Sequence, residues 1–257
     1  SAQQNGRLLA QQIDANGNLS NAWSTGGNLP AGRAWGQLEA AGGTLYYIGG
    51  QTNTATDERP EIYWATPSAG AVSWAAVGGS YDLPDGRTQH SAVSWNNRIY
   101  VTGGIAETGG AVSSVVYVSP DLSAGGAIAS AWSTTSSFNI ARSGHSLVAY
   151  ANNLYLLGGY DGTNYLSDTQ FASIGYKTGS ISQSGTTVTG SGTAWTAAQV
   201  GSNILYADGS TALITGYTSA TSLTVDVNKS VTGGSIYTIQ DGSISTWAYS
   251  TSLATPI

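Results

Sequence analysis

An internal repeat with a spacing of 54 or 55 residues constrains the fold of this 257-residue chain more than any other feature. Three segments align without gaps. In each, an arginine is followed 13 positions later by a tyrosine, and 16 and 17 positions later by a glycine pair. The segments run over Arg33–Gly50, Arg87–Gly104 and Arg142–Gly159, with the tyrosines at Tyr46, Tyr100 and Tyr155. A unit that recurs at a fixed spacing predicts a stack of similar motifs, each burying its apolar face against the next.

Each segment has the pattern of a β-hairpin. In the third segment, strands are predicted over Ser146–Tyr150 and Leu154–Leu157, with a turn at Asn152-Asn153 between them. The corresponding turns are predicted at Asn96-Asn97 and Gly42-Gly43, because Asn and Gly tolerate the positive φ of tight hairpin turns. The second strand is nearly all apolar, which predicts an inner strand buried on both faces.

Two further strands are predicted after each hairpin, followed by a polar link to the next arginine. The third strand is predicted at Ile62–Ala65, Val115–Val118 and Thr169–Ile174, and a glycine-containing turn follows at Gly70, Gly125-Gly126 and Asp241-Gly242. The fourth strand is predicted to end near a tryptophan, at Trp74, Trp132 and Trp247. The N-terminus offers half of the same unit, with a strand at Leu8–Ile13, a turn at Asn16-Gly17, and Trp23.

Four strands in a unit of about 50 residues are typical of a β-propeller blade. The patterns R-x-G-H-S-x-V and L-Y-x-x-G-G, followed by a late tryptophan, resemble kelch repeats. The resemblance implies an all-β fold of kelch-like four-stranded blades, about three and a half in this chain. The first repeat departs from the pattern, because Gly36-Gln37 stand where the later repeats have His90-Ser91 and His145-Ser146.

Propellers usually close with four to eight blades, and an open stack leaves sheet surfaces bare. The chain is therefore expected to be part of a longer polypeptide, with a ring made from several chains as the alternative. On either reading it would belong to a larger assembly.

The third repeat is interrupted by about 62 residues, 177–238, which are rich in Gly, Ser and Thr. Alternating polar and apolar residues predict short strands at 181–183, 187–189, 204–206, 212–214 and 222–225. The runs TTVTGSGTAWTAAQVG and ITGYTSATSLTV resemble small β modules of bacteriophage tail and fibre proteins. The predicted organisation is kelch-like blades over 1–176, an inserted small β module over 177–238, and a return to the last blade over 239–257.

The composition excludes several classes of protein. Only 9% of the residues are charged, where soluble domains carry about 25%. The net charge of −6, with 8 dispersed basic residues, argues against a nucleic-acid binder. The absence of Cys excludes thiolate metal sites, and no apolar run is long enough for a membrane helix. A surface with so few charges favours a chain that lies within an assembly.

Residues at equivalent repeat positions are predicted to be structural. They are Arg33, Arg87 and Arg142, His90 and His145, and Trp23, Trp74, Trp132 and Trp247. Each arginine would make one blade-to-blade contact, each histidine would bond to an adjacent strand or loop, and each tryptophan would pack within the fold. Three alternatives remain open: a carboxylate-binding arginine triad like that of sialidase propellers, a two-histidine metal site, and a calcium site or catalytic pair among Asp57, Glu58 and Glu61. We predict no catalytic residue, metal ligand or cofactor.

Five residues in loops or outside the repeat pattern are candidates for a ligand site. They are Trp35, Tyr160, Asp161, Asn164 and Tyr165. Exposed aromatic rings beside Asn and Asp suit a sugar, because an aromatic face stacks on the apolar face of a sugar ring. Packing within the loop is the alternative.

These features favour a non-enzymatic extracellular structural or adhesion protein, in particular a bacteriophage virion component such as a tail fibre or receptor-binding part. Its expected partners are other chains of the assembly and a cell-surface glycan. The first alternative is a secreted or surface bacterial kelch-like protein that binds glycans or proteins. The second is a glycan-active enzyme.

Overall fold

The computed structural model describes residues 7–10, 24–52, 57–68 and 72–250. The chain divides into two compact units, one of residues 1–171 with 246–257 and the other of residues 172–245. The turn predicted at Asn16-Gly17, Trp23 and Gly70 lie outside the described residues. Within the described ranges, no helix is long and apolar enough to cross a lipid bilayer.

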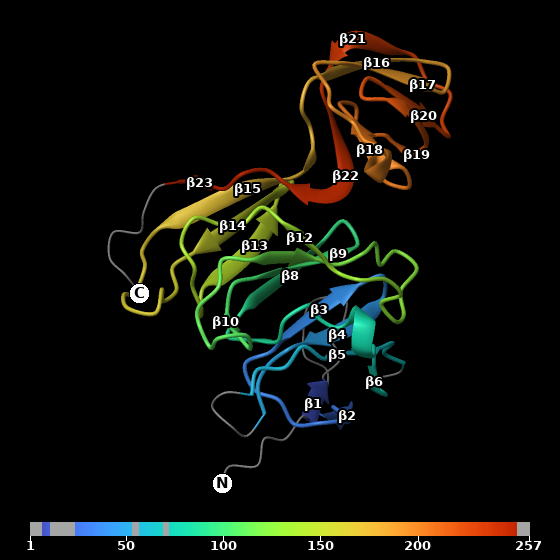
Figure 1. Ribbon diagram of the computed structural model, residues 1–257. Coiled ribbons are helices and arrows are strands. Elements are labelled where there is room, and N and C mark those ends of the chain that lie inside the picture. Colours follow the sequence, from blue (N-terminus) through green and yellow to red (C-terminus); the bar gives the residue numbers. More distant parts are fainter. Residues whose placement is uncertain (1–6, 11–23, 53–56, 69–71, 251–257) are drawn as a thin grey trace, which may run out of the picture. The chain divides into compact units, whose positions relative to one another are not determined.

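Two antiparallel four-stranded sheets form what we call blades A and B, and four strands of an eleven-stranded antiparallel sheet form what we call blade C (Figure 1). Blade A consists of β3 (Gln37–Ala41), β4 (Thr44–Ile48), β5 (Ile62–Ala65) and β6 (Ala75–Ala76). Blade B consists of β8 (Ser91–Trp95), β9 (Arg98–Thr102), β11 (Val116–Val118) and β12 (Ser133–Thr135). Blade C consists of β13 (Ser146–Tyr150), β14 (Asn153–Leu157), the first part of β15 (Thr169–Tyr176) and β23 (Ala248–Tyr249). The predicted all-β fold of four-stranded blades is confirmed.

Shorter elements accompany the blades. β1 (Arg7–Ala10) pairs with β2 (Ser24–Asn28), and β7 (Arg87–Thr88) pairs with β10 (Ile105–Ala106). A single 3-10 turn, η1 (Gly79–Tyr81), lies in the link between blades A and B.

The hairpin turns have the positive φ angles that the sequence predicts. Gly42-Gly43 and Asn96-Asn97 form the first two turns, with φ between 48° and 74°. The third prediction is wrong by one residue, because Ala151 (φ 48°) and Asn152 (φ 57°) form the turn while Asn153 starts β14. Two-residue turns of this kind match the twist of the strands they join.

The predicted position of the fourth strand is wrong. β6, β12 and β23 each begin at the residue after the tryptophan, at Trp74, Trp132 and Trp247. Before the tryptophan, apolar residues such as Val72 and Ile128 are buried in irregular segments and not in a strand.

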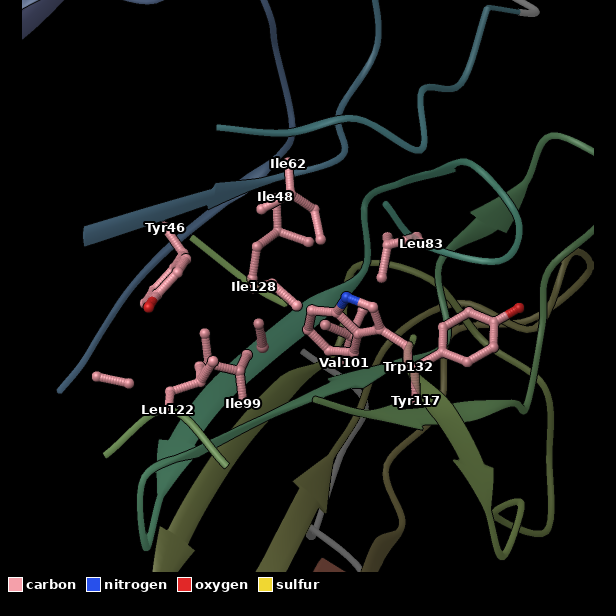
Figure 2. Packing of buried hydrophobic residues seen from close by; sticks show 12 residues of the cluster. Tyr46, Ile48, Ile62, Leu83, Ile99, Val101, Tyr117, Leu122, Ile128 and Trp132 are labelled. Atoms are coloured by element: carbon pink, nitrogen blue, oxygen red, sulfur yellow. The ribbon is translucent and has the colours of Figure 1, made fainter. Parts of the chain in front are cut away.

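Each blade has two faces, and the pairing register shows which residues share a face. We call the face toward the next blade in the sequence the trailing face, and the face toward the preceding blade the leading face. The trailing face of blade A carries Ala41, Tyr46, Ile48 and Ile62, and the leading face of blade B carries Ala92, Ile99, Val101 and Tyr117. These eight residues form one buried core together with Leu83, Leu122, Ile128 and Trp132 (Figure 2). Burial of this apolar surface between the sheets is the main force that holds blade A to blade B.

The prediction of an inner strand buried on both faces fails for blades A and C. In β4, Leu45 and Tyr47 on the leading face are half-buried. In β14, Leu154 and Leu156 are buried on the leading face, whereas Tyr155 and Leu157 on the trailing face are half-buried. Among the described residues, no sheet covers this trailing face, so only one face of the apolar strand β14 is fully buried.

The second unit is a small β domain with its own core. Beyond the last part of β15, it contains β16 (Ser180–Ser184), β17 (Thr187–Ser191), η2 (Ala197–Gln199), β18 (Asn203–Tyr206), β19 (Thr211–Ser219), β20 (Ser222–Val225), β21 (Val231–Ser235) and β22 (Tyr237–Ile244). Trp195 lies at the centre, and its Nε1 donates to the Tyr237 hydroxyl at 3.0 Å. That hydroxyl donates in turn to the Thr178 carbonyl at 2.7 Å, so both buried polar groups are satisfied.

The turn predicted at Asp241-Gly242 is wrong, because both residues lie inside β22. Gly242 has φ 83°, Gly175 in β15 has φ 84°, and the register between the two strands shifts beside Gly175. Glycine at a positive φ serves a β-bulge as well as a turn, and the sequence pattern does not separate the two.

Candidate functional site

The three repeat arginines have their guanidinium groups held inside their own blades. Arg87 donates to the Gly103 carbonyl at 2.9 Å and to the Tyr117 hydroxyl at 3.0 Å. Arg142 donates to the Gly158 carbonyl at 2.7 Å and forms two bonds of 2.8 Å to the carboxylate of Asp168.

Burial raises the pKa of Asp168, but the bonds from Arg142 and Gln170 outweigh it and hold the pKa below its usual value. Arg33 binds Glu61 and Tyr63 in the same manner. The guanidinium groups thus serve the blades that carry them and do not converge on a shared ligand.

Main-chain bonds of the same repeat join neighbouring blades. The Gly50 N–H donates to the Arg87 carbonyl at 2.7 Å, and the Gly104 N–H donates to the Arg142 carbonyl at 2.9 Å. Each glycine pair thus approaches the next blade closely enough for a hydrogen bond. The inter-blade contact expected of the arginine position is made by its carbonyl.

The two histidines lie between blades. His145 Nε2 is 2.8 Å from the Thr102 hydroxyl of blade B, and its ring lies against Gly103. His90 lies in the same way against Gly49 of blade A, but the residue equivalent to Thr102 is Ile48, which has no hydroxyl. Burial, with the charge of the neighbouring arginine, lowers the pKa of each histidine to about 3.

The repeat tryptophans hold the links between blades. Trp132 Nε1 donates to the Tyr81 carbonyl at 3.2 Å, and Trp247 Nε1 donates to the Ser136 carbonyl at 2.9 Å. Both rings are buried, and Trp74 is half-buried.

The position two residues after each arginine adopts a left-handed backbone. Trp35 has φ 56°, Gln89 has φ 53° and Gly144 has φ 63°. A ladder joins them, because the Gln89 N–H donates to the Trp35 carbonyl at 3.1 Å and the Gly144 N–H donates to the Gln89 carbonyl at 2.9 Å. Bulky residues in this conformation cost roughly 1–2 kcal/mol, and such strain is concentrated at functional sites.

Two adjoining hollows open beside this ladder. One, of about 300 Å³, is lined by Gln89, Ser143, Gly144, Gly159, Tyr160 and Tyr165. The other, of about 320 Å³, is lined by Trp35, Gln37, Gln89, His90, Gly144 and His145. Because Gln89 and Gly144 line both, we treat them as one candidate site, the Gln89 site.

Three of the five predicted ligand residues line the Gln89 site. Trp35 is 58% exposed and Tyr165 is 70% exposed, so both rings are open to a ligand. Tyr160 and Tyr165 face each other with their ring centroids 5.3 Å apart.

The other two predicted residues shape the loop. Asp161 Oδ1 accepts from the backbone N–H groups of Thr163 and Asn164 at 2.7 and 2.6 Å. These bonds hold the pKa of the exposed Asp161 carboxyl below its usual value. The Asp161 N–H donates to the Asn164 carbonyl at 3.1 Å, which closes the loop that carries Tyr160 and Tyr165.

Sequence reasoning missed Gln89. It stands at the repeat position of Gly144, and a position where one repeat has glycine is a candidate for positive φ. Comparing that position across the three repeats would have indicated a shared left-handed backbone at Trp35, Gln89 and Gly144.

Two of the three acidic residues in the loop between β4 and β5 form ion pairs, and the third, Glu58, is buried. Asp57 pairs with Arg59, and Glu61 pairs with Arg33 at 3.2 Å. Within the described ranges, no three His, Cys, Asp or Glu side chains gather closely enough to hold a metal ion.

The model of the KLHDC2/KLHL20/DRC7 Kelch-repeats domain family matches residues 36–229. The chain belongs to this kelch-repeat family. The kelch resemblance read from the repeats is therefore confirmed, whereas the phage-like character of the insert stays a prediction. No curated protein matches the chain.

The solved structure titled "Structure of YjhT" matches this kelch chain with a TM-score of 0.50 at 16% identity. The match covers 66% of this chain and 50% of that one, so the chain spans half the length of YjhT. At this identity the similarity concerns the fold alone.

Proposed function

We propose that this kelch chain is a non-enzymatic glycan-binding module of an extracellular structural or adhesion protein. The observation that carries the proposal is the presence of Trp35, Tyr160 and Tyr165 at one polar site, the Gln89 site. Aromatic rings of this kind offer flat apolar faces next to polar groups, which is the combination that a sugar ring needs.

The site offers hydrogen bonds that suit hydroxyl groups. Gln89 contributes an amide that both donates and accepts, and Tyr165 contributes an exposed hydroxyl group. The main-chain ladder fixes the backbone of Trp35 and Gln89 before a ligand arrives, and such preorganisation lowers the entropic cost of binding.

The lining of the site supports binding without hydrolysis. Glycoside hydrolysis generally needs two carboxyl groups on either side of the scissile bond, and neither Asp nor Glu lines the two hollows. His90 and His145 are buried, and their lowered pKa values keep them neutral at pH 7.

Binding to purified host-surface polysaccharides and to a glycan array tests the proposal. We expect Trp35→Ala and Tyr165→Ala to weaken binding about tenfold or more, since each removes one stacking face. Tyr217→Ala, a partly exposed tyrosine of the second unit, is the matched control and should bind as the parent chain does. Equal binding by all three variants would contradict the site, and release of oligosaccharides would contradict the non-enzymatic assignment.

We propose further that this protein is a bacteriophage virion component such as a tail fibre or receptor-binding part. The insert supports this, through the resemblance of TTVTGSGTAWTAAQVG to phage tail modules. A mass spectrum of purified virions should contain peptides of this chain. Their absence, together with genomic neighbours that encode secretion rather than tail proteins, would favour a bacterial surface protein instead.

A further inference from the structure

Equivalent residues of the three blades differ in whether another blade covers them. On the trailing face, Tyr46 of blade A and Tyr100 of blade B are completely buried, whereas the equivalent Tyr155 of blade C is half-buried. Ala41 of blade A is buried and Trp95 of blade B is half-buried, but the equivalent Tyr150 of blade C is 70% exposed.

The bare trailing face of blade C is apolar and continuous. Pairing places Val148 opposite Tyr155, and the Tyr155 ring stacks on Phe171 with centroids 6.2 Å apart. Val148 is 49% exposed, and Leu157 and Phe171 are half-buried. Contiguous exposed apolar surface of this kind marks an interaction site.

The opposite end of the stack carries the matching surface. On the leading face of blade A, Leu38 is 46% exposed and Tyr47 is half-buried. The equivalent residues of blade B, Ala92 and Val101, are buried against blade A. Among the residues that the structure describes, no sheet packs on the trailing face of blade C or on the leading face of blade A.

The two hydrogen-bond series end in complementary groups. In the first series, the Gly50 N–H donates to the Arg87 carbonyl and the Gly104 N–H donates to the Arg142 carbonyl. By repeat position, the next donor would be the Gly159 N–H on blade C, and the acceptor at the other end would be the Arg33 carbonyl on blade A. In the ladder, the outermost groups are the Trp35 N–H on blade A and the Gly144 carbonyl on blade C. Each end has the donor or acceptor that the other end needs.

We propose that a second copy of this chain docks head to tail, with the trailing face of blade C of one copy covering the leading face of blade A of the other. The interface repeats the packing that already joins blade A to blade B. A second copy is the occupant because the chain itself carries both halves of that contact. The arrangement is heterologous, so the two faces are inactivated by different substitutions.

Sedimentation of the full chain over a wide range of concentration tests the proposal. We expect reversible self-association, weakened about tenfold or more by Tyr150→Asp on one face and by Leu38→Asp on the other. The control Tyr249→Asp lies on an exposed edge strand outside the bare face and should associate as the parent does. Because all three side chains are exposed, the variants should keep the melting temperature of the parent.

Mixing the two variants distinguishes head-to-tail docking from other contacts. Tyr150→Asp retains the blade A face and Leu38→Asp retains the blade C face, so their mixture should form a one-to-one heterodimer. A parent chain that stays monomeric at every concentration would overturn the proposal. Variants that associate like the parent, or a mixture that does not pair, would also overturn it.

Discussion

Blades B and C have the same repeat but different surroundings. In blade B the trailing face is buried, with Tyr100 and Thr102 completely inaccessible, whereas in blade C the same face is open at Val148 and Tyr150. The repeat thus specifies a hairpin and an interface together, and the interface is completed only where another blade follows. An apolar inner strand therefore indicates that another blade packs on its sheet, as well as that the strand lies in a hydrophobic core.

The two blades also hold their arginines differently. Arg87 stacks on Tyr117, with its guanidinium carbon 4.6 Å from the ring centroid, and bonds to the tyrosine hydroxyl. Arg142 binds the Asp168 carboxylate through two bonds and approaches the Phe138 ring less closely, at 5.9 Å. At the same repeat position, Arg142 binds a carboxylate through two short hydrogen bonds, whereas Arg87 bonds to neutral groups and lies 3.7 Å from the Asp85 carboxylate.

The largest expected effect is on the free energy of unfolding when either arginine is replaced. Arg142→Ala leaves the partly buried Asp168 without its cation and should lower the free energy of unfolding by about 3–5 kcal/mol. Arg87→Ala removes bonds to a hydroxyl and a carbonyl and a longer, 3.7 Å ion pair with Asp85, and should cost less, about 1–3 kcal/mol. Urea unfolding measures both. The partly exposed pair of Arg59 with Asp57 is the control, with about 1 kcal/mol for Arg59→Ala. An equal cost for Arg87 and Arg142 would break the contrast.

The second prediction compares equivalent glycines. A Cβ at Gly103 would lie 2.6 Å from the Arg142 carbonyl oxygen and 2.7 Å from the His145 ring, whereas at Gly158 the nearest atom would be 3.4 Å away. Both glycines have φ near 60°. We expect Gly158→Ala to cost about 1–2 kcal/mol from the backbone alone, and Gly103→Ala about 1–3 kcal/mol more from overpacking. Thermal and urea unfolding of the pair checks this, and equal costs would mean that blade C does not press on blade B.

Between pH 7 and 6, the smallest effect is a pH dependence shared by the two blades. The folded pKa values of His90 and His145, about 3, lie below the ordinary value of 6.5, so the unfolded chain binds more protons between these limits. Stability should therefore be full above pH 6.5 and fall as the pH decreases toward 3, by about 1 kcal/mol in total between pH 7 and 6. Urea unfolding at several pH values should show a flatter slope for the His90→Gln/His145→Gln variant. An unchanged slope would contradict burial of the rings.

The blade architecture could be predicted from the sequence because periodicity and turn residues are local signals. β5 and β13 have the bounds that alternation and turn chemistry indicate. The fourth strands could not be placed, since residues such as Ile128 are apolar because they fill a core and not because they alternate in a strand. Gly242 has the positive φ that a turn requires, but it lies inside β22 at a bulge and not in a turn.

The candidate site was partly accessible to the same reasoning. Trp35, Tyr160 and Tyr165 stood out as aromatic residues outside the repeat pattern, and the fold places them along one hollowed surface. Gln89 was missed because its role depends on inter-blade bonds between residues 54 or 55 positions apart. Asp161 and Asn164 close the loop, a role that composition does not distinguish from ligand binding.

Hydroxyl-radical footprinting of the tyrosines tests the central claim, that the repeat forms stacked blades with one face of blade C bare. The chain contains neither Cys nor Met, so the residues that oxidise most readily do not compete with tyrosine. At low protein concentration we expect Tyr46 and Tyr100 to be unreactive, Tyr155 to react slowly and Tyr150 to react readily. Reaction of Tyr46 or Tyr100 as fast as that of Tyr150 would show that the blades do not stack and would contradict the account.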